Sequence, residues 1–204
     1  MPPKAGICYL CGKEYDKAKM KAHFLSEHRT QELGQDCFVI KAEGVDDKSY
    51  WLFFDVPMDS SLSTVDSFLR KIWLDCCGHL SEFDGTSKSR KIGDFETGDT
   101  LIHSYDFGST TETKLTFVGK TKRSPQRTKV RLLARNKMPE FKCACCGKPA
   151  EFVCTEASPS ADSTFCEECA DGLEQSEMFL PITNSPRSGI CGYTGEHDDF
   201  SVDS

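Results

Sequence analysis

The stretch Tyr50–Cys76, YWLFFDVPMDSSLSTVDSFLRKIWLDC, changes its hydrophobic period from two to that of an α-helix and thereby indicates the fold class. Its first part alternates apolar side chains, as a half-buried β-strand does, and Pro57 ends that pattern. Ser63 and Asp66 then have the spacing of a helix capping box. The apolar face of the predicted helix, which we expect to end near Gly78, comprises Val65, Phe68, Leu69, Ile72, Trp73 and Cys76.

Strand-like runs flank this stretch on both sides. The run DCFVIKAE (36–43) precedes it and is joined to it by the hairpin loop GVDDKS. Four more runs follow: HLSEF, DTLIHSYDF, TKLTFVGK and KVRLLAR. Two strands, one helix and four strands, in that order, predict an α+β domain with a mostly antiparallel sheet covered by the helix, rather than a doubly wound sheet. We place this domain at residues 36–138.

The N-terminus and the overall composition suggest a protein of the cell interior. No apolar run approaches the roughly 20 residues of a membrane helix, and MPPKAGICYL lacks the layout of a secretion signal. We therefore expect a cytoplasmic protein without membrane association. In a reducing cytosol, 12 cysteines in 204 residues favour metal sites over disulfides.

The segment Cys8–His28, CYLCGKEYDKAKMKAHFLSEH, has the spacing C-x2-C-x11-H-x4-H of a two-Cys, two-His zinc finger. The small apolar plug of such a finger is present as well, in Tyr15, Met20 and Leu25. The alternative, a disordered arm, leaves these plug residues unexplained. We expect residues 1–32 to fold around one zinc ion held by Cys8, Cys11, His23 and His28.

A second set of cysteines lies after the α+β domain, at residues 141–195. Two C-x2-C knuckles at the spacing found there make a four-thiolate zinc site, with the ligands Cys143, Cys146, Cys166 and Cys169. Cys145 is expected to be spare. This region resembles cross-brace fingers of the HIT and MYND type, in which a second zinc would use Cys154, but Ala157 stands where its partner would be. That second site therefore looks lost, with Cys154 and Cys191 able at most to assist a weak one.

Charge is distributed unevenly along the chain, which has a net charge of −7. Residues 1–30 carry +3 and residues 120–142 carry +8, whereas residues 143–204 carry −10 and end in an acidic tail at 196–204. The basic segments could contact DNA or RNA phosphates. Candidate contacts are Lys17, Lys19, Lys21, Arg123, Arg127, Lys129 and Arg131. The alternatives are a solvated helix face for the lysines and an exposed edge strand, protected by its charges, for the second segment.

The central region resembles the Ri-plasmid ORF-3-like family over residues 36–137. In longer, archaeal-type members the likeness extends to the run LPITNSPRSGICGYTG (180–195). The landmarks that carry it are Val56, Pro57, Leu62, His79, Leu80, Tyr105, Asp106, Phe107 and Gly108. The resemblance implies an α+β fold and no settled biochemical activity.

These observations together predict an interaction or adaptor protein with two structural zinc ions and a protein partner. Binding of DNA or RNA through the basic segments is a further possibility. Four protein ligands at each zinc leave no position for a catalytic water. The alternative is an enzyme with a cleft near His79, Tyr105 and Asp106. His103 shares its strand face with apolar residues, so we expect it to be buried and hydrogen-bonded.

Overall fold

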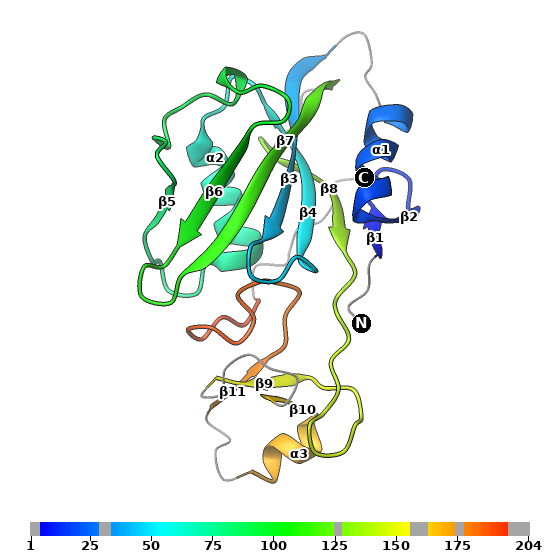
Figure 1. The fold of residues 1–204 in the computed structure, drawn as a ribbon, viewed down its shortest axis with the longest axis vertical. Coiled ribbons are helices and arrows are strands. Elements are labelled where there is room, and N and C mark those ends of the chain that lie inside the picture. The colour runs from blue at the N-terminus through cyan, green and yellow to red at the C-terminus, as the bar shows by residue number, and fades with distance from the viewer. Residues whose placement is uncertain (1–4, 29–33, 125–127, 156–162, 174–177, 196–204) are drawn as a thin grey trace.

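An eight-stranded sheet forms the centre of the fold in the computed structural model, which describes residues 5–28, 34–124, 128–155, 163–173 and 178–195 (Figure 1). The strand order is β2-β1-β8-β4-β3-β7-β6-β5, and every neighbouring pair is antiparallel. The prediction of a mostly antiparallel sheet is thereby confirmed. Its strands are β1 (Ala5–Cys8), β2 (Glu14–Asp16), β3 (Gln35–Gly44), β4 (Trp51–Pro57), β5 (Ser81–Phe83), β6 (Thr100–Tyr105), β7 (Thr111–Arg123) and β8 (Arg131–Asn136).

One face of the sheet packs against helix α2 (Leu62–Leu69), which continues as a π-helix, η1 (Arg70–Leu74). Side chains of both helices share a buried apolar cluster with Leu52, Phe54 and strands β3 and β7. The expected capping box is wrong, because α2 begins after Ser61 and has no side-chain cap. Asp66 instead accepts hydrogen bonds from other elements. A short 3-10 helix, η2 (Ile92–Asp94), lies further along the chain.

The opposite face of the sheet is covered by helix α1 (Lys17–Glu27) of the predicted finger. Met20 and Phe24 of α1 pack there against Trp51 and Phe53 of β4, with the Phe24 and Phe53 ring centroids 5.4 Å apart. Strand β4 is therefore buried on both faces. The close approach of β1 requires a glycine, since a Cβ on Gly6 would lie 2.3 Å from the Trp51 ring.

The finger is continuous with the central sheet because β1 pairs with β8 in the register Gly6↔Asn136, Ile7↔Arg135 and Cys8↔Ala134. Strand β8 pairs with β4 on its other side. The hypothesis that the basic run KVRLLAR is an exposed edge strand is therefore wrong. Within the central domain alone, β8 would be an edge strand, and β1 of the N-terminal hairpin pairs with its free side.

A second, three-stranded sheet lies below the large one in Figure 1, in the order β10-β9-β11. Its elements are β9 (Phe152–Cys154), β10 (Thr164–Phe165), α3 (Glu167–Asp171) and β11 (Phe179–Pro181). We call residues 141–181 the ribbon. Residues 182–195, the C-terminal extension, return from it to the central domain (orange in Figure 1).

The extension is anchored in the core by polar contacts. Trp73 Nε1 donates to the Asn184 carbonyl at 3.1 Å, and the fully buried Arg187 pairs with Asp106 at 2.6 Å. Within the part of the chain that the structure describes, none of the helices combines the length and the apolar character needed to cross a bilayer.

Candidate metal centres

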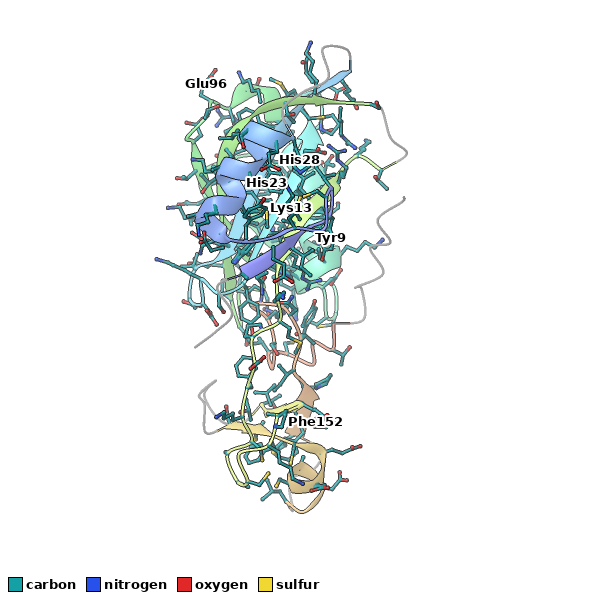
Figure 2. The ribbon with its side chains drawn as sticks, turned by 90° about the vertical axis from the view of Figure 1, so that its right-hand side faces the viewer. Tyr9, Lys13, His23, His28, Glu96 and Phe152 are labelled. Atoms are coloured by element: carbon teal, nitrogen blue, oxygen red, sulfur yellow. The ribbon has the colours of Figure 1, made fainter. Side chains whose placement is uncertain are left out.

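The four predicted finger ligands come together at the junction of the N-terminal hairpin and α1. One donor atom each from Cys8, Cys11, His23 and His28 lies within 4.8 Å of all the others. Cys11 Sγ is 3.3 Å from His23 Nε2, and Cys8 Sγ is 3.5 Å from His28 Nε2. Figure 2 shows His23 of α1 next to His28, which directly follows the helix, with Lys13 close by.

Backbone geometry of the hairpin turn aims the two finger sulfurs at one point. The Gly12 N–H donates to the Cys8 carbonyl at 2.7 Å, and the Cys8 N–H donates to the Lys13 carbonyl at 2.9 Å. Gly12 has φ +71°, a conformation that favours glycine. The turn is therefore specified by the sequence Cys-Gly-Lys that follows the first thiol.

The imidazoles are held in the form and orientation that suit a metal. Burial lowers the pKa of His28, and the charge of His23 lowers it further. The lower pKa favours the neutral form of the ring, which binds metal. Glu27 Oε2 lies 3.4 Å from His23 Nδ1, on the side of the ring away from the sulfurs. A carboxylate in that position orients a ligating histidine. Lys13 in turn pairs with Glu27 at 3.0 Å.

The ribbon contains the second predicted cluster, and its first knuckle repeats the finger turn. Gly147 N–H donates to the Cys143 carbonyl at 2.9 Å, and Cys143 N–H to the Lys148 carbonyl at 2.7 Å. The Sγ atoms of Cys143, Cys146, Cys166 and Cys169 lie within 4.8 Å of one another.

The backbone around the ribbon cluster favours thiolate. Backbone N–H groups donate hydrogen bonds to the Cys143 sulfur and lower its pKa to about 6. The N–H of Cys166 contributes most to this effect. Hydrogen bonding with the neighbouring thiols, Cys166 first, instead raises the pKa of Cys169. A divalent cation among the sulfurs stabilises all four as thiolates, because it offsets their mutual repulsion.

A third cluster, which the sequence analysis missed, joins Cys76, Cys77, His79 and Cys191, with one donor atom of each within 4.8 Å of the rest. The sequence allowed Cys191 at most a weak assisting role beside Cys154 in the ribbon, but the structure places Cys191 in this third cluster. Cys76, expected to pack as a small hydrophobe, does pack against the core, and its Sγ also joins this cluster.

A repeated dipeptide is the sequence signal that could have marked Cys77 and Cys191 as candidate ligands, though not their meeting in one cluster. Cys-Gly occurs four times in the chain, twice in the predicted knuckles and twice in the third cluster. All four glycines have positive φ: Gly12 (71°), Gly78 (77°), Gly147 (73°) and Gly192 (69°). The remaining ribbon cysteines behave differently. Cys154 is buried in β9 and Cys145 is exposed, and among the described residues neither belongs to a cluster of metal-ligating side chains.

The α1 lysines proposed for nucleic acid are partly engaged within the protein. Lys17 Nζ lies 2.6 Å from Glu43 Oε2, and Lys19 Nζ lies 3.6 Å from Asp16 Oδ2. Lys21 is exposed on the helix. Phosphate contact by α1 would therefore depend mainly on Lys21 and on breaking or sharing these ion pairs.

Two of the four candidate basic residues before and within β8 pair with a buried carboxylate. Arg123 is 3% exposed, and its Nε lies 3.1 Å from the fully buried Asp55 carboxylate. Arg131 donates through Nε to the same carboxylate at 3.0 Å. Arg123 is therefore not accessible to phosphate. The prediction that it contacts nucleic acid is wrong, because its side chain is buried against Asp55. Lys129 is exposed, and Arg127 lies outside the described residues.

The residues of the alternative enzyme hypothesis lie close together, but their polar atoms make structural contacts. Tyr105 is fully buried, and its hydroxyl donates to Asp75 Oδ1 at 2.9 Å. A hydrogen bond from Arg187 lowers the pKa of Asp106 to about 2. His79 is a member of the third cluster. In this structure, the polar atoms of Tyr105 and Asp106 are therefore engaged by Asp75 and Arg187.

His103 is buried and hydrogen-bonded, as predicted. It has no exposed surface, and its Nε2 lies 2.7 Å from Asp66 Oδ1. Asp66 also accepts from Ser81 Oγ at 2.6 Å and from Lys88 Nζ at 3.0 Å. This network joins α2 to β5 and β6.

Comparison with known proteins gives little guidance. No family model matches the chain, and no curated protein matches it. Among solved structures, it is similar to the crystal structure of MM3350, a protein of unknown function from Methanosarcina mazei Go1. The identity is 15% and the TM-score 0.43, over 53% of this chain and 71% of that one.

Proposed function

We propose that this protein is a zinc-stabilised interaction or adaptor protein of the cytoplasm, whose metal ions are structural. The observation that carries the proposal is the number of donors: each cluster gathers four protein atoms within 4.8 Å. Four protein ligands complete the tetrahedron of a zinc ion and leave no position for a reactive water.

The donor types and spacings support zinc as the metal. Thiolate sulfur and imidazole nitrogen are the ligands of structural zinc sites. Around a tetrahedral zinc ion, sulfurs lie about 3.8 Å apart, and a sulfur and a nitrogen about 3.6 Å apart. The Cys146 and Cys166 sulfurs are 3.6 Å apart, and the two sulfur–nitrogen distances quoted for the finger are 3.3 and 3.5 Å.

A cavity of about 520 Å³ between the central domain, the ribbon and the extension offers a place for a protein partner. The β3–β4 loop, the start of β7, the ribbon and the extension all contribute to its walls. Apolar side chains such as Phe141, Val153 and Ile182 form much of the lining. The volume suits one or two side chains of a bound segment.

The charge of the cavity identifies the chemistry of that partner. Asp46, Asp47 and Glu112 line it and are exposed to solvent. Among the described residues that line it, none is lysine or arginine. We infer that the cavity takes a protein segment with a basic side chain next to apolar ones, because opposite charge steers association and excludes acidic competitors.

Random peptides displayed on phage and selected against the immobilised full chain test this proposal. We expect enrichment of Lys or Arg flanked by apolar residues. A synthetic peptide from the selection should bind at least about tenfold more weakly to a variant in which the three cavity carboxylates are amides. That variant is Asp46→Asn, Asp47→Asn and Glu112→Gln.

A matched control loses the same charge from exposed residues that do not line the cavity. It carries the substitutions Asp59→Asn, Glu82→Gln and Asp84→Asn. Its affinity for the peptide should stay within about twofold of the native value. Selection of acidic peptides, or equal weakening in both variants, would refute the proposed partner.

Membership of the Ri-plasmid ORF-3-like family is part of the proposal. Its landmarks lie at joints of the central domain: Val56 and Pro57 end β4, Leu62 begins α2, and Tyr105 ends β6. Landmark residues at the ends of strands and at the start of a helix support a fold shared with that family. We do not extend the proposal to nucleic acid, because the buried pairing of Arg123 removes part of the basic segment.

A further inference from the structure

We propose that Cys76, Cys77, His79 and Cys191 hold a third zinc ion, which fastens the C-terminal extension to the central domain. The finger and the ribbon each take their ligands from one local stretch. In the third cluster, by contrast, Cys191 follows His79 by 112 positions. The inference concerns this site alone and is independent of the proposed peptide cavity.

The distances between the donor atoms fit one small cation. Cys77 Sγ is 3.6 Å from Cys76 Sγ and 3.9 Å from Cys191 Sγ, close to the edge of about 3.8 Å for a zinc tetrahedron. His79 Nε2 lies 2.9 Å from Cys77 Sγ and 3.2 Å from Cys191 Sγ. Both sulfur–nitrogen distances are below the about 3.6 Å of a zinc tetrahedron, by about 0.7 and 0.4 Å, so the His79 ring would move outward when the ion binds.

The backbone on both sides of the cluster is held in uncommon conformations. Among the described residues, Asp106 and Cys191 are the non-glycine residues with positive φ, at 64° and 50°. Asp106 Oδ2 lies 3.5 Å from His79 Nε2, so Asp106 borders the cluster, and Cys191 is one of its members. The π-helix η1 ends two residues before Cys76. Strained backbone of this kind persists where surrounding interactions determine it, as at ligand sites.

The electrostatic surroundings suit three thiolates. Three thiolates, a neutral imidazole and Zn²⁺ together carry a charge of −1. Arg187 Nη2 lies 3.5 Å from Cys76 Sγ and can donate to it. The same guanidinium pairs with Asp106, so the extension brings a cation and a ligand to the cluster together.

Other contacts of the extension place Cys191 before any metal binds. Ser185 Oγ donates to the Trp73 carbonyl at 2.6 Å, and Tyr193 hydroxyl donates to the Ile72 carbonyl at 3.3 Å. Cys191 therefore reaches the cluster on a segment anchored at both ends. Because of these anchors, a chain without the Cys191 thiol is expected to keep its fold.

Elemental analysis of the full chain, loaded with zinc and dialysed, tests the proposal. We expect three zinc ions per native chain and two in the variants Cys191→Ser and Cys77→Ser. Cys145→Ser is the matched control, because Cys145 is an exposed cysteine outside the clusters, and it should keep three. Unchanged far-ultraviolet circular dichroism of the variants would show that they remain folded.

Hydrogen exchange supplies the second measurement. In Cys191→Ser, amides of residues 185–195 should exchange at least about tenfold faster, with residues 5–28 unchanged. Two zinc ions in the native chain, or three in Cys191→Ser, would overturn the proposal. A Cys77–Cys191 disulfide in the native chain would overturn it too. None of these measurements uses a peptide, so this site and the cavity can fail separately.

Discussion

Replacement of Phe24 by alanine should destabilise the central domain as well as the finger. The Phe24 side chain lies in the cluster that α1 forms with β4, and the residue is 4% exposed. Truncation of a buried phenylalanine costs about 3–5 kcal/mol of unfolding free energy. For a chain of this size, that corresponds to a fall in melting temperature of roughly 6–20 °C. Leu25, the next residue, is 38% exposed, so Leu25→Ala is the control and should cost about 1 kcal/mol or less.

The two tryptophans allow the two faces of the sheet to be observed separately. Trp51 packs under α1, whereas Trp73 belongs to the cluster on the α2 face. Thermal unfolding in zinc-containing buffer, followed by Trp73 fluorescence in a Trp51→Phe background, therefore reports on the face that Phe24 does not touch. We expect Phe24→Ala to lower the midpoint temperature of this unfolding transition. If the Trp73 transition stayed in place while the finger lost its metal, the finger would be an independent module and the reasoning would fail.

Three further predictions concern the buried network, the ribbon and the core arginine. Burial acts to raise the pKa of Asp66, but hydrogen bonds from His103 and others lower it below the ordinary 3.8. Asp66→Ala should cost about 3 kcal/mol at neutral pH, and the difference from the native chain in urea unfolding should shrink as the pH falls below about 4. Cys143→Ser should remove one zinc ion per chain and leave the finger loaded, which elemental analysis and hydrogen exchange of residues 5–28 can check. Arg123→Ala should cost about 3 kcal/mol, because it removes a partner of the buried Asp55, and an unchanged urea midpoint would contradict this.

Local sequence patterns were sufficient for the strands β3 to β8 of the central domain, for α2 and for the first two clusters. Metal knuckles, alternating strands and amphipathic helices each depend on neighbours within about 20 residues. The eight predicted zinc ligands accordingly meet in two clusters of four. Periodicity also identified His103 as a buried residue.

Features that depend on distant pairing could not be predicted in this way. Cys191 joins Cys76, Cys77 and His79 through a fold that brings residues 112 positions apart together, and no local spacing encodes that. Likewise, β8 reads as an edge strand until the N-terminal hairpin is seen to add to it. The burial of Arg123 follows from its pairing with Asp55, which is 68 positions earlier in the chain and offers no local signal.

If the finger holds zinc as proposed, the pairing of β1 with β8 would link zinc supply to self-association. Without metal, the hairpin would lose the ion that fixes its turn to α1, and separation of β1 would leave the backbone groups of β8 that face it unpaired. An unpaired strand border next to the apolar surface of Trp51 and Phe53 is a template for joining another copy of the chain. Loss of zinc would then favour aggregation of the protein.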